Sequence, residues 1–181
     1  MSIVLLDAND MKRTLGRLAH EILEAHGGAQ DLVVVGVMKR GYPVAKRLAF
    51  VMTTVEGRTI PCGKLDTSRY RDDIRPGETE DLSEIPFEVT NKDVILVDEV
   101  IFTGRTIRAA MDALLKFGRP RTIQLAVLVD RGYREFPIQP DYCGREIESD
   151  RGDHVIVKVH EFDGEDAVVL ESATIAEESH A

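Results

Sequence analysis

Two adjacent carboxylates stand between a run of aliphatic residues and a turn rich in hydroxyl groups. The aliphatic run is 94–97, the acids are Asp98 and Glu99, and the turn at 103–106 reads Thr-Gly-Arg-Thr. A strand that leads into a helix at this turn leaves free backbone N–H groups and a positive dipole end, which suit a phosphate. Carboxylates suit ribose hydroxyls and a hydrated Mg²⁺ instead. Together these residues predict a sugar-phosphate site at the end of a buried strand.

Two other phosphate-binding motifs are absent from the sequence. No Gly-Lys-Ser/Thr of a Walker A loop is present, and no G-x-G-x-x-G follows a predicted strand. For any single residue of 94–106, an ordinary strand end or helix cap explains the residue type equally well. The whole thirteen-residue arrangement favours a binding site.

Hydrophobic periodicity predicts the helices that position this segment. Apolar residues recur at helical spacing over 9–25 and stop at Gly27-Gly28. A second helix follows the turn at 38–41, with Pro43 in its first turn. A third begins near Gly104, and its inward-facing residues are expected to be Ile107, Ala110, Met111, Leu114 and Leu115.

Continuous apolar runs at 32–37, 94–97 and 123–129 predict strands that are covered on both faces. Weaker strands are expected at 59–66 and 142–144. Asp163-Gly164 lies between the β-rich runs 154–159 and 167–170, which predicts a hairpin or meander. Strands alternating with amphipathic helices predict an α/β fold with a mostly parallel central sheet and helices on both faces.

Length and composition indicate one domain over residues 1–181. Segment 70–90 has seven acidic residues and two prolines and is expected to be a mobile loop, and the polar tail 172–181 is expected to be frayed. No apolar run is long enough to span a membrane. The start of the chain lacks signal-peptide features, and Cys62 and Cys143 read as reduced thiols, so a cytoplasmic location is expected.

Segment 94–106 resembles the signature of the type I phosphoribosyltransferases, which bind 5-phosphoribosyl-1-pyrophosphate (PRPP). Within that superfamily, residues 3–172 resemble the PyrR family of bifunctional pyrimidine-operon attenuators and uracil phosphoribosyltransferases. The segments that carry this resemblance are 19–21, 36–41, 70–73, 94–106, 118–120 and 124–132. One departure is Glu99, where the family usually has Asp. The resemblance implies a type I phosphoribosyltransferase fold with a flexible hood loop and a C-terminal β-rich segment.

The family pattern implies roles for individual residues. Asp98 and Glu99 would bind the ribose of PRPP and lie near a Mg²⁺ that PRPP itself carries, with no direct metal ligand assigned to the protein. The 5'-phosphate loop would consist of Phe102, Thr103, Gly104, Arg105 and Thr106. The pyrophosphate loop would consist of Lys39, Arg40 and Gly41. Tyr70 and Arg71 would start the hood, and Arg131 and Val155 would bind the base or nucleotide.

The implied reaction is Mg²⁺-dependent transfer of ribose 5-phosphate from PRPP to uracil, giving UMP and pyrophosphate. Hypoxanthine-guanine enzymes of the superfamily place an Asp before the Thr-Gly, where this chain has Phe102. An aromatic ring cannot accept a proton, so a pyrimidine is favoured. Segment 140–144 is similar to purine transferases, so hypoxanthine or guanine transfer stays open as an alternative.

The family also implies a homo-oligomer, a dimer or tetramer, that binds pyrimidine-operon leader mRNA under control of UMP. Arg13, Arg17 and His20 recur at i, i+4 and i+7 and could form a stripe that meets RNA phosphates, extended by Arg134 and Arg145. An exposed polar helix face explains the same spacing. A net charge of -9 argues against non-specific nucleic-acid binding. Because the family binds RNA, a regulator with vestigial enzyme activity is a second alternative.

Overall fold

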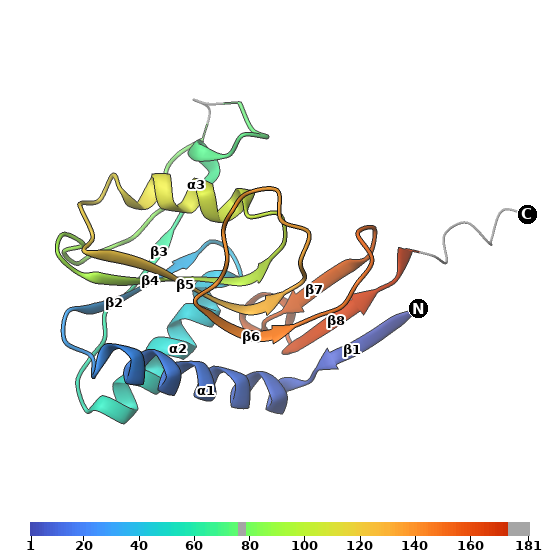
Figure 1. Ribbon diagram of the computed structural model, residues 1–181, viewed down its shortest axis with the longest axis horizontal. Coiled ribbons are helices and arrows are strands. Elements are labelled where there is room, and N and C mark those ends of the chain that lie inside the picture. The colour runs from blue at the N-terminus through green and yellow to red at the C-terminus, as the bar shows by residue number, and fades with distance from the viewer. Residues whose placement is uncertain (76–78, 174–181) are drawn as a thin grey trace, which may run out of the picture.

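The computed structural model describes residues 1–75 and 79–173, and within these ranges five strands form a parallel sheet of order β3-β2-β4-β5-β6 (Figure 1). The expected frayed tail lies outside the described residues from 174 onward, as do 76–78 of the acidic loop. The strands are β2 (Leu32–Val37), β3 (Cys62–Leu65), β4 (Asp93–Ile101), β5 (Thr122–Asp130) and β6 (Tyr142–Glu146). Every residue of β2 is buried, as expected for a strand covered on both faces.

Helices cover both faces of this sheet, which confirms the predicted fold class. Helices α1 (Ala8–His26) and α2 (Gly41–Glu56) pack on one face, and α3 (Arg105–Leu114) packs on the other (Figure 1). Helix α1 begins at a capping box in which Asp7 and Asp10 bond each other's backbone N–H groups, and it ends at Gly27 in the left-handed conformation. Helix α3 ends at Leu114, so the prediction that Leu115 faces inward is wrong: its side chain is 53% exposed.

A second sheet in the described ranges has the order β1-β8-β7 and is antiparallel. Strands β7 (His154–Lys158) and β8 (Ala167–Glu171) form the expected hairpin, joined through the short helix α4 (His160–Asp163). The third strand, β1 (Ser2–Leu6), has no counterpart among the predicted strands. It pairs with β8 near the other end of the chain, so its formation depends on a partner distant in sequence and not on a local pattern. No helix within the described residues is long and apolar enough to cross a membrane.

The structure corrects where the two carboxylates lie. Asp98 and Glu99 belong to β4, which continues to Ile101 because it stays paired with β5 beyond them. The neighbouring strand β2 ends earlier, and its last pair with β4 is Gly36 with Val97. The two acids therefore lie where one neighbour of β4 has stopped and the strand edge is open. Open α/β sheets bind ligands at such carboxyl ends.

Candidate active site

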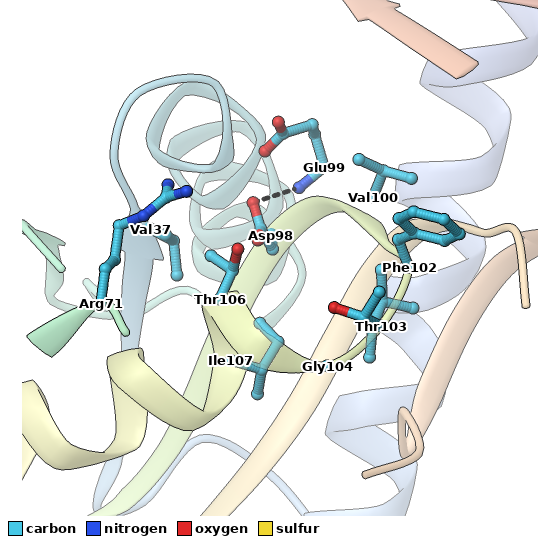
Figure 2. Close-up of a pocket in the computed structure, with 11 residues that line it drawn as sticks. Val37, Arg71, Asp98, Glu99, Val100, Phe102, Thr103, Gly104, Thr106 and Ile107 are labelled. Atoms are coloured by element: carbon cyan, nitrogen blue, oxygen red, sulfur yellow. Dashed lines mark hydrogen bonds between the residues drawn. The ribbon is translucent and has the colours of Figure 1, made fainter. Parts of the chain in front are cut away.

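A cavity of about 260 Å³ opens at the carboxyl end of β4 (Figure 2). It is lined by Val37, Arg71, Asp98, Glu99, Val100, Ile101, Phe102, Thr103, Gly104, Thr106 and Ile107. In the view of Figure 2, Arg71 and Phe102 lie on opposite sides of the group, with Asp98 and Thr106 between them. The structure thus brings together both predicted acids, most of the predicted phosphate loop and one predicted hood residue.

The carboxyl group of Asp98 forms the floor of this cavity. Asp98 is 5% exposed, and its Oδ1 accepts the Glu99 backbone N–H at 2.9 Å. Burial, and next the neighbouring charge of Glu99, raise the pKa of Asp98 well above its usual value. A buried carboxylate next to a second acid favours a partner that brings hydrogen-bond donors or positive charge. Ribose hydroxyls and a cation are partners of that kind.

The turn after β2 packs directly against Asp98. A Cβ atom at Gly41 would lie 2.9 Å from Asp98 Oδ1 and 2.9 Å from the Val97 carbonyl oxygen, closer than such contacts ever come. Only glycine therefore fits here without moving the acid. The Met38–Lys39 peptide bond in this turn is cis, and the Lys39 side chain is exposed.

We expect a Gly41→Ala variant to lose most activity, because its methyl group displaces either Asp98 or the turn. The kcat/KM for PRPP should fall by about tenfold or more, because displacing a catalytic group by about 1 Å can reduce the rate by an even larger factor. Steady-state kinetics on PRPP would measure this loss. Gly16→Ala in α1, where a Cβ meets no atom within 4 Å and φ is not positive, is the control at a glycine that does not line the cavity. Wild-type kinetics in Gly41→Ala would show that the close packing of Gly41 against Asp98 is not needed for activity.

Arg40 does not point into the cavity. Its guanidinium binds the Asp163 carboxylate of α4 through Nε at 3.1 Å and Nη2 at 2.7 Å. This pairing, together with the Val159 N–H, lowers the pKa of Asp163 to about 2. The Arg40 side chain, predicted to contact pyrophosphate, therefore connects the turn to α4 instead of lining the cavity.

Two backbone carbonyl oxygens of the predicted phosphate loop, those of Phe102 and Thr103, accept hydrogen bonds from residues 134–136. Arg134 Nη1 donates to the Phe102 carbonyl oxygen at 2.8 Å, and the backbone N–H groups of Glu135 and Phe136 donate to that of Thr103 at 2.8 and 3.1 Å. Gly104 has φ of 90° and starts α3. The Arg105 backbone N–H donates to Thr103 Oγ1 at 3.3 Å, and the N–H groups that follow it in the first turn of α3 are of the kind that bind an anion at a helix N-terminus.

Arg134 was predicted to extend an exposed RNA-binding stripe, and the structure contradicts this. Its side chain is 13% exposed and pairs with Asp130 at 2.6 Å. Besides the Phe102 carbonyl it bonds the Ile138 carbonyl at 2.7 Å. Arg134 is thus a structural support of the phosphate loop that the sequence reasoning missed.

Arg131 stacks on the Phe102 ring, with its guanidinium carbon 4.1 Å from the ring centroid. It is 7% exposed, and burial lowers its pKa. Its Nη atoms donate to the carbonyl oxygens of Asp153 at 2.9 Å and Asp150 at 3.1 Å. Arg131 therefore adjoins the cavity through Phe102. Val155, the other predicted base-binding residue, pairs with Leu170 in the second sheet and does not line the cavity.

Two further predicted residues lie beside the cavity mouth. Arg105 does not line the main cavity: it lines an adjoining cavity of about 190 Å³, together with Arg71, Asp72, Asp73, Thr103 and Thr106. Tyr70 ends the 3₁₀ turn η1 (Ser68–Tyr70), and its carbonyl oxygen accepts Arg108 Nη2 at 3.0 Å. The described part of the hood segment thus begins against helix α3.

The side chains present fit a magnesium ion that is shared with a ligand. Within residues 1–75 and 79–173, no group of three or more His, Cys, Asp or Glu residues is arranged to hold a metal by itself. Asp98 and Glu99 offer hard oxygen donors at the cavity wall. Phosphate oxygens and water would complete the coordination of a hydrated Mg²⁺.

The four remaining candidates for RNA contact lie on helix α1 and on the adjacent strand β6. Arg13, Arg17 and His20 are exposed on α1. Arg17 pairs with Glu21 at 2.7 Å and donates to the Gly144 carbonyl of β6, next to Arg145. Arg145 is also exposed, and its Nη1 donates to the Leu5 carbonyl at 2.8 Å.

Comparisons with known proteins identify the family of this chain. Residues 4–161 match the family model described as "Phosphoribosyl transferase domain". The chain is 48% identical to "Bifunctional protein PyrR" of Pelotomaculum thermopropionicum over 92% of this chain and 93% of that protein. It is 50% identical to "Bifunctional protein PyrR" of Thermus thermophilus over 92% and 93%.

A solved hypoxanthine phosphoribosyltransferase from Staphylococcus aureus is 19% identical, with a TM-score of 0.71 over 94% of this chain and 91% of that one. At this identity the likeness establishes the fold alone, and it confirms the type I phosphoribosyltransferase architecture. The curated relatives are more than twice as similar in sequence and extend over nearly the whole chain. The chain therefore belongs to the PyrR family of phosphoribosyltransferase-fold proteins.

Proposed function

We propose that this protein transfers ribose 5-phosphate from PRPP to uracil, producing UMP and pyrophosphate. The observation that carries the proposal is the pairing of buried Asp98 and adjacent Glu99 with a helix N-terminus at one cavity. Acceptors for ribose hydroxyls and donors for a phosphate are the two requirements of a sugar-phosphate site. Membership in the PyrR family supports uracil as the acceptor.

In this proposal the described residues bind, orient and shield the substrate. N–H groups at the start of α3 hold the 5'-phosphate, and Asp98 and Glu99 accept ribose hydroxyls. The turn that ends at Gly41 and the Arg71 side chain hold the pyrophosphate from opposite sides. Asp98 and Glu99 would lie next to a hydrated Mg²⁺ carried by PRPP, and its positive charge would offset the negative charge of the departing pyrophosphate. The chemistry therefore rests on positioning and charge stabilisation and needs no covalent nucleophile.

The direct test is formation of UMP from PRPP and uracil by the purified protein in the presence of Mg²⁺. We expect product only when both substrates are present, and we expect excess EDTA to stop it. A protein that binds PRPP but forms no UMP would leave the alternative of a regulator with vestigial activity. A protein that does not bind PRPP would refute the assignment of the cavity.

We also propose that the protein binds pyrimidine-operon leader mRNA in a UMP-dependent manner. The observation that favours this second activity is the clustering of Arg13, Arg17, His20 and Arg145 on the exposed surface made by α1 and β6. The clustered charges are few, and the net charge of the chain is -9. We therefore expect weaker binding and a shallower salt dependence than for a strongly basic relative, since each neutralised phosphate adds roughly 0.7 to 0.9 to the slope.

We expect UMP to tighten RNA binding, and an Arg17→Ala variant to lose it. The reason is that Arg17 contributes a permanent charge and also fixes the α1–β6 surface through Gly144. Filter binding of a leader transcript with and without UMP measures both effects. Arg58→Ala is a control at an exposed arginine far along the chain from this surface. Equal binding of a scrambled RNA at moderate salt would contradict the regulatory function.

Three further properties belong to the proposal. We expect one domain over residues 1–181, in line with the family match over 4–161. A cytoplasmic location agrees with Cys62 and Cys143, both of which are free thiols. A homo-oligomer agrees with Phe50, which is 72% exposed on α2 beside a partly apolar cavity.

A further inference from the structure

Two arginines from the first turn of α3 contact the hood segment on either side of Arg71. Arg108 Nη2 donates to the carbonyl oxygen of Tyr70 at 3.0 Å, and Arg105 Nη1 pairs with the carboxylate of Asp72. The residue between these anchors, Arg71, lines both cavities at the mouth of the site. Its backbone is therefore fixed to α3 at the preceding and the following residue.

Arg105 is itself held by a second set of contacts. Its Nε donates to Glu135 Oε2 at 2.7 Å, and its guanidinium carbon lies 4.9 Å from the Phe136 ring centroid. Glu135 also accepts Arg151 Nη2 at 2.8 Å. The backbone N–H groups of Glu135 and Phe136 bond the Thr103 carbonyl. A continuous chain of contacts thus connects the hood segment to the phosphate loop.

The guanidinium of Arg71 binds the neighbouring acid Asp73. Its Nε and Nη2 donate to the two carboxylate oxygens of Asp73 at 2.8 and 2.6 Å. A phosphate group offers the same pair of acceptor oxygens to a guanidinium fork. Arg71 can therefore exchange Asp73 for a phosphate at the cavity mouth without leaving its anchored position.

We propose that Arg105, Arg108 and Asp72 are positioning residues, forming a clamp that holds Arg71 over the site to bind the pyrophosphate group of PRPP. The identity of the ligand rests on the proposed function. In the clamp, Arg105 acts through Asp72 and does not bind the 5'-phosphate with its side chain. The ion pair is partly exposed, with side chains 47% and 39% accessible, so its role lies in placing Arg71 rather than in stabilising the fold.

Removing the Asp72 carboxylate should change PRPP affinity in opposite directions, depending on whether Asp72 acts through its charge alone or through the clamp. PRPP is a polyanion, so removing a carboxylate near its site should strengthen binding by ordinary electrostatics. The clamp predicts that removing the Asp72 carboxylate weakens binding, because residues 71 and 72 lose their hold on α3. The direction of the change in an Asp72→Asn variant therefore separates the two explanations.

The test compares PRPP binding by calorimetry, with Mg²⁺ present, and the KM values of PRPP and uracil. We expect Asp72→Asn to raise Kd and KM for PRPP by about three- to tenfold, as loss of a charge-assisted contact would. The KM for uracil should change by less than about twofold, since no clamp residue contacts the base site. Asp72→Glu should restore most of the affinity. Glu80→Gln, an exposed acid of the same segment with no bond in the described residues, is the control of equal charge.

Coupling within the clamp is the second readout. Asp72→Asn should have little further effect in an Arg105→Gln background, because both changes break the same contact. Thermal unfolding should be close to wild type in each variant. If Asp72→Asn changes the Kd for PRPP no more than Glu80→Gln does, or lowers it, the clamp is wrong while the proposed function stands. A wild-type protein that does not bind PRPP would refute both.

Discussion

An Asp98→Asn, Glu99→Gln double variant should lose transferase activity almost completely while it keeps its fold. Both side chains line the cavity, and the amides that replace them carry no negative charge and offer one acceptor oxygen in place of two, so they bind ribose hydroxyls and a cation more weakly than carboxylates do. Loss of two charged contacts at a reacting centre predicts a fall of about 10³-fold or more in kcat/KM. Steady-state assay of UMP formation measures the loss.

The control for this prediction is stability, and its sign follows from the pKa of Asp98. Burial raises that pKa in the folded protein, so the folded state binds the proton more tightly than the unfolded chain, whose pKa is about 3.9. The contribution of Asp98 to stability is therefore lost as the pH rises through the raised value. At pH 7 an Asp98→Asn single variant should unfold at a higher temperature than wild type, and the difference should shrink below about pH 4. Wild-type turnover in the double variant would remove both acids from the mechanism.

Uracil should exceed hypoxanthine and guanine as acceptor by about a hundredfold or more in kcat/KM, a difference typical of a site built for one hydrogen-bonding pattern. The position before Thr103-Gly104 holds Phe102, whose ring centroid lies 4.1 Å from the guanidinium carbon of Arg131 and 6.1 Å from the ring centroid of Tyr133. This hydrocarbon surface offers no proton acceptor to a purine. Chromatography of the nucleotide products with each base measures the preference.

A matched variant tests whether Phe102 acts alone. Phe102→Asp should reduce uracil transfer, because Arg131 loses the ring on which it stacks. It should not create a purine enzyme, since the rest of the pocket keeps its shape. Efficient guanine transfer by the wild-type protein would overturn the pyrimidine assignment.

Local patterns predicted the elements that carry the site. The apolar runs of β2, β4 and β5 and the periodicity of α1 depend on neighbours in sequence, and their positions agree with the structure. The two acids and most of the predicted phosphate loop line one cavity for the same reason: strand, acids, turn and helix are contiguous in the sequence. The exact end of β4 was missed, because it depends on pairing with β5 beyond the point where β2 stops.

Side-chain partners far apart in sequence could not be predicted. The family resemblance implied a pyrophosphate contact for Arg40, yet its side chain pairs with Asp163 across the fold. Arg134 was assigned to RNA from its charge, yet it supports the phosphate loop from inside. An arginine on a loop has several carboxylates and carbonyls within reach, and only tertiary packing selects one.

The central claim is tested most directly by measuring pyrophosphate release from PRPP with uracil, orotate, adenine, hypoxanthine and guanine in parallel. The account predicts Mg²⁺-dependent release with uracil that is matched one for one by UMP, and release near background with the three purines. Release with hypoxanthine or guanine but not with uracil would contradict the account, and so would the absence of release with every base.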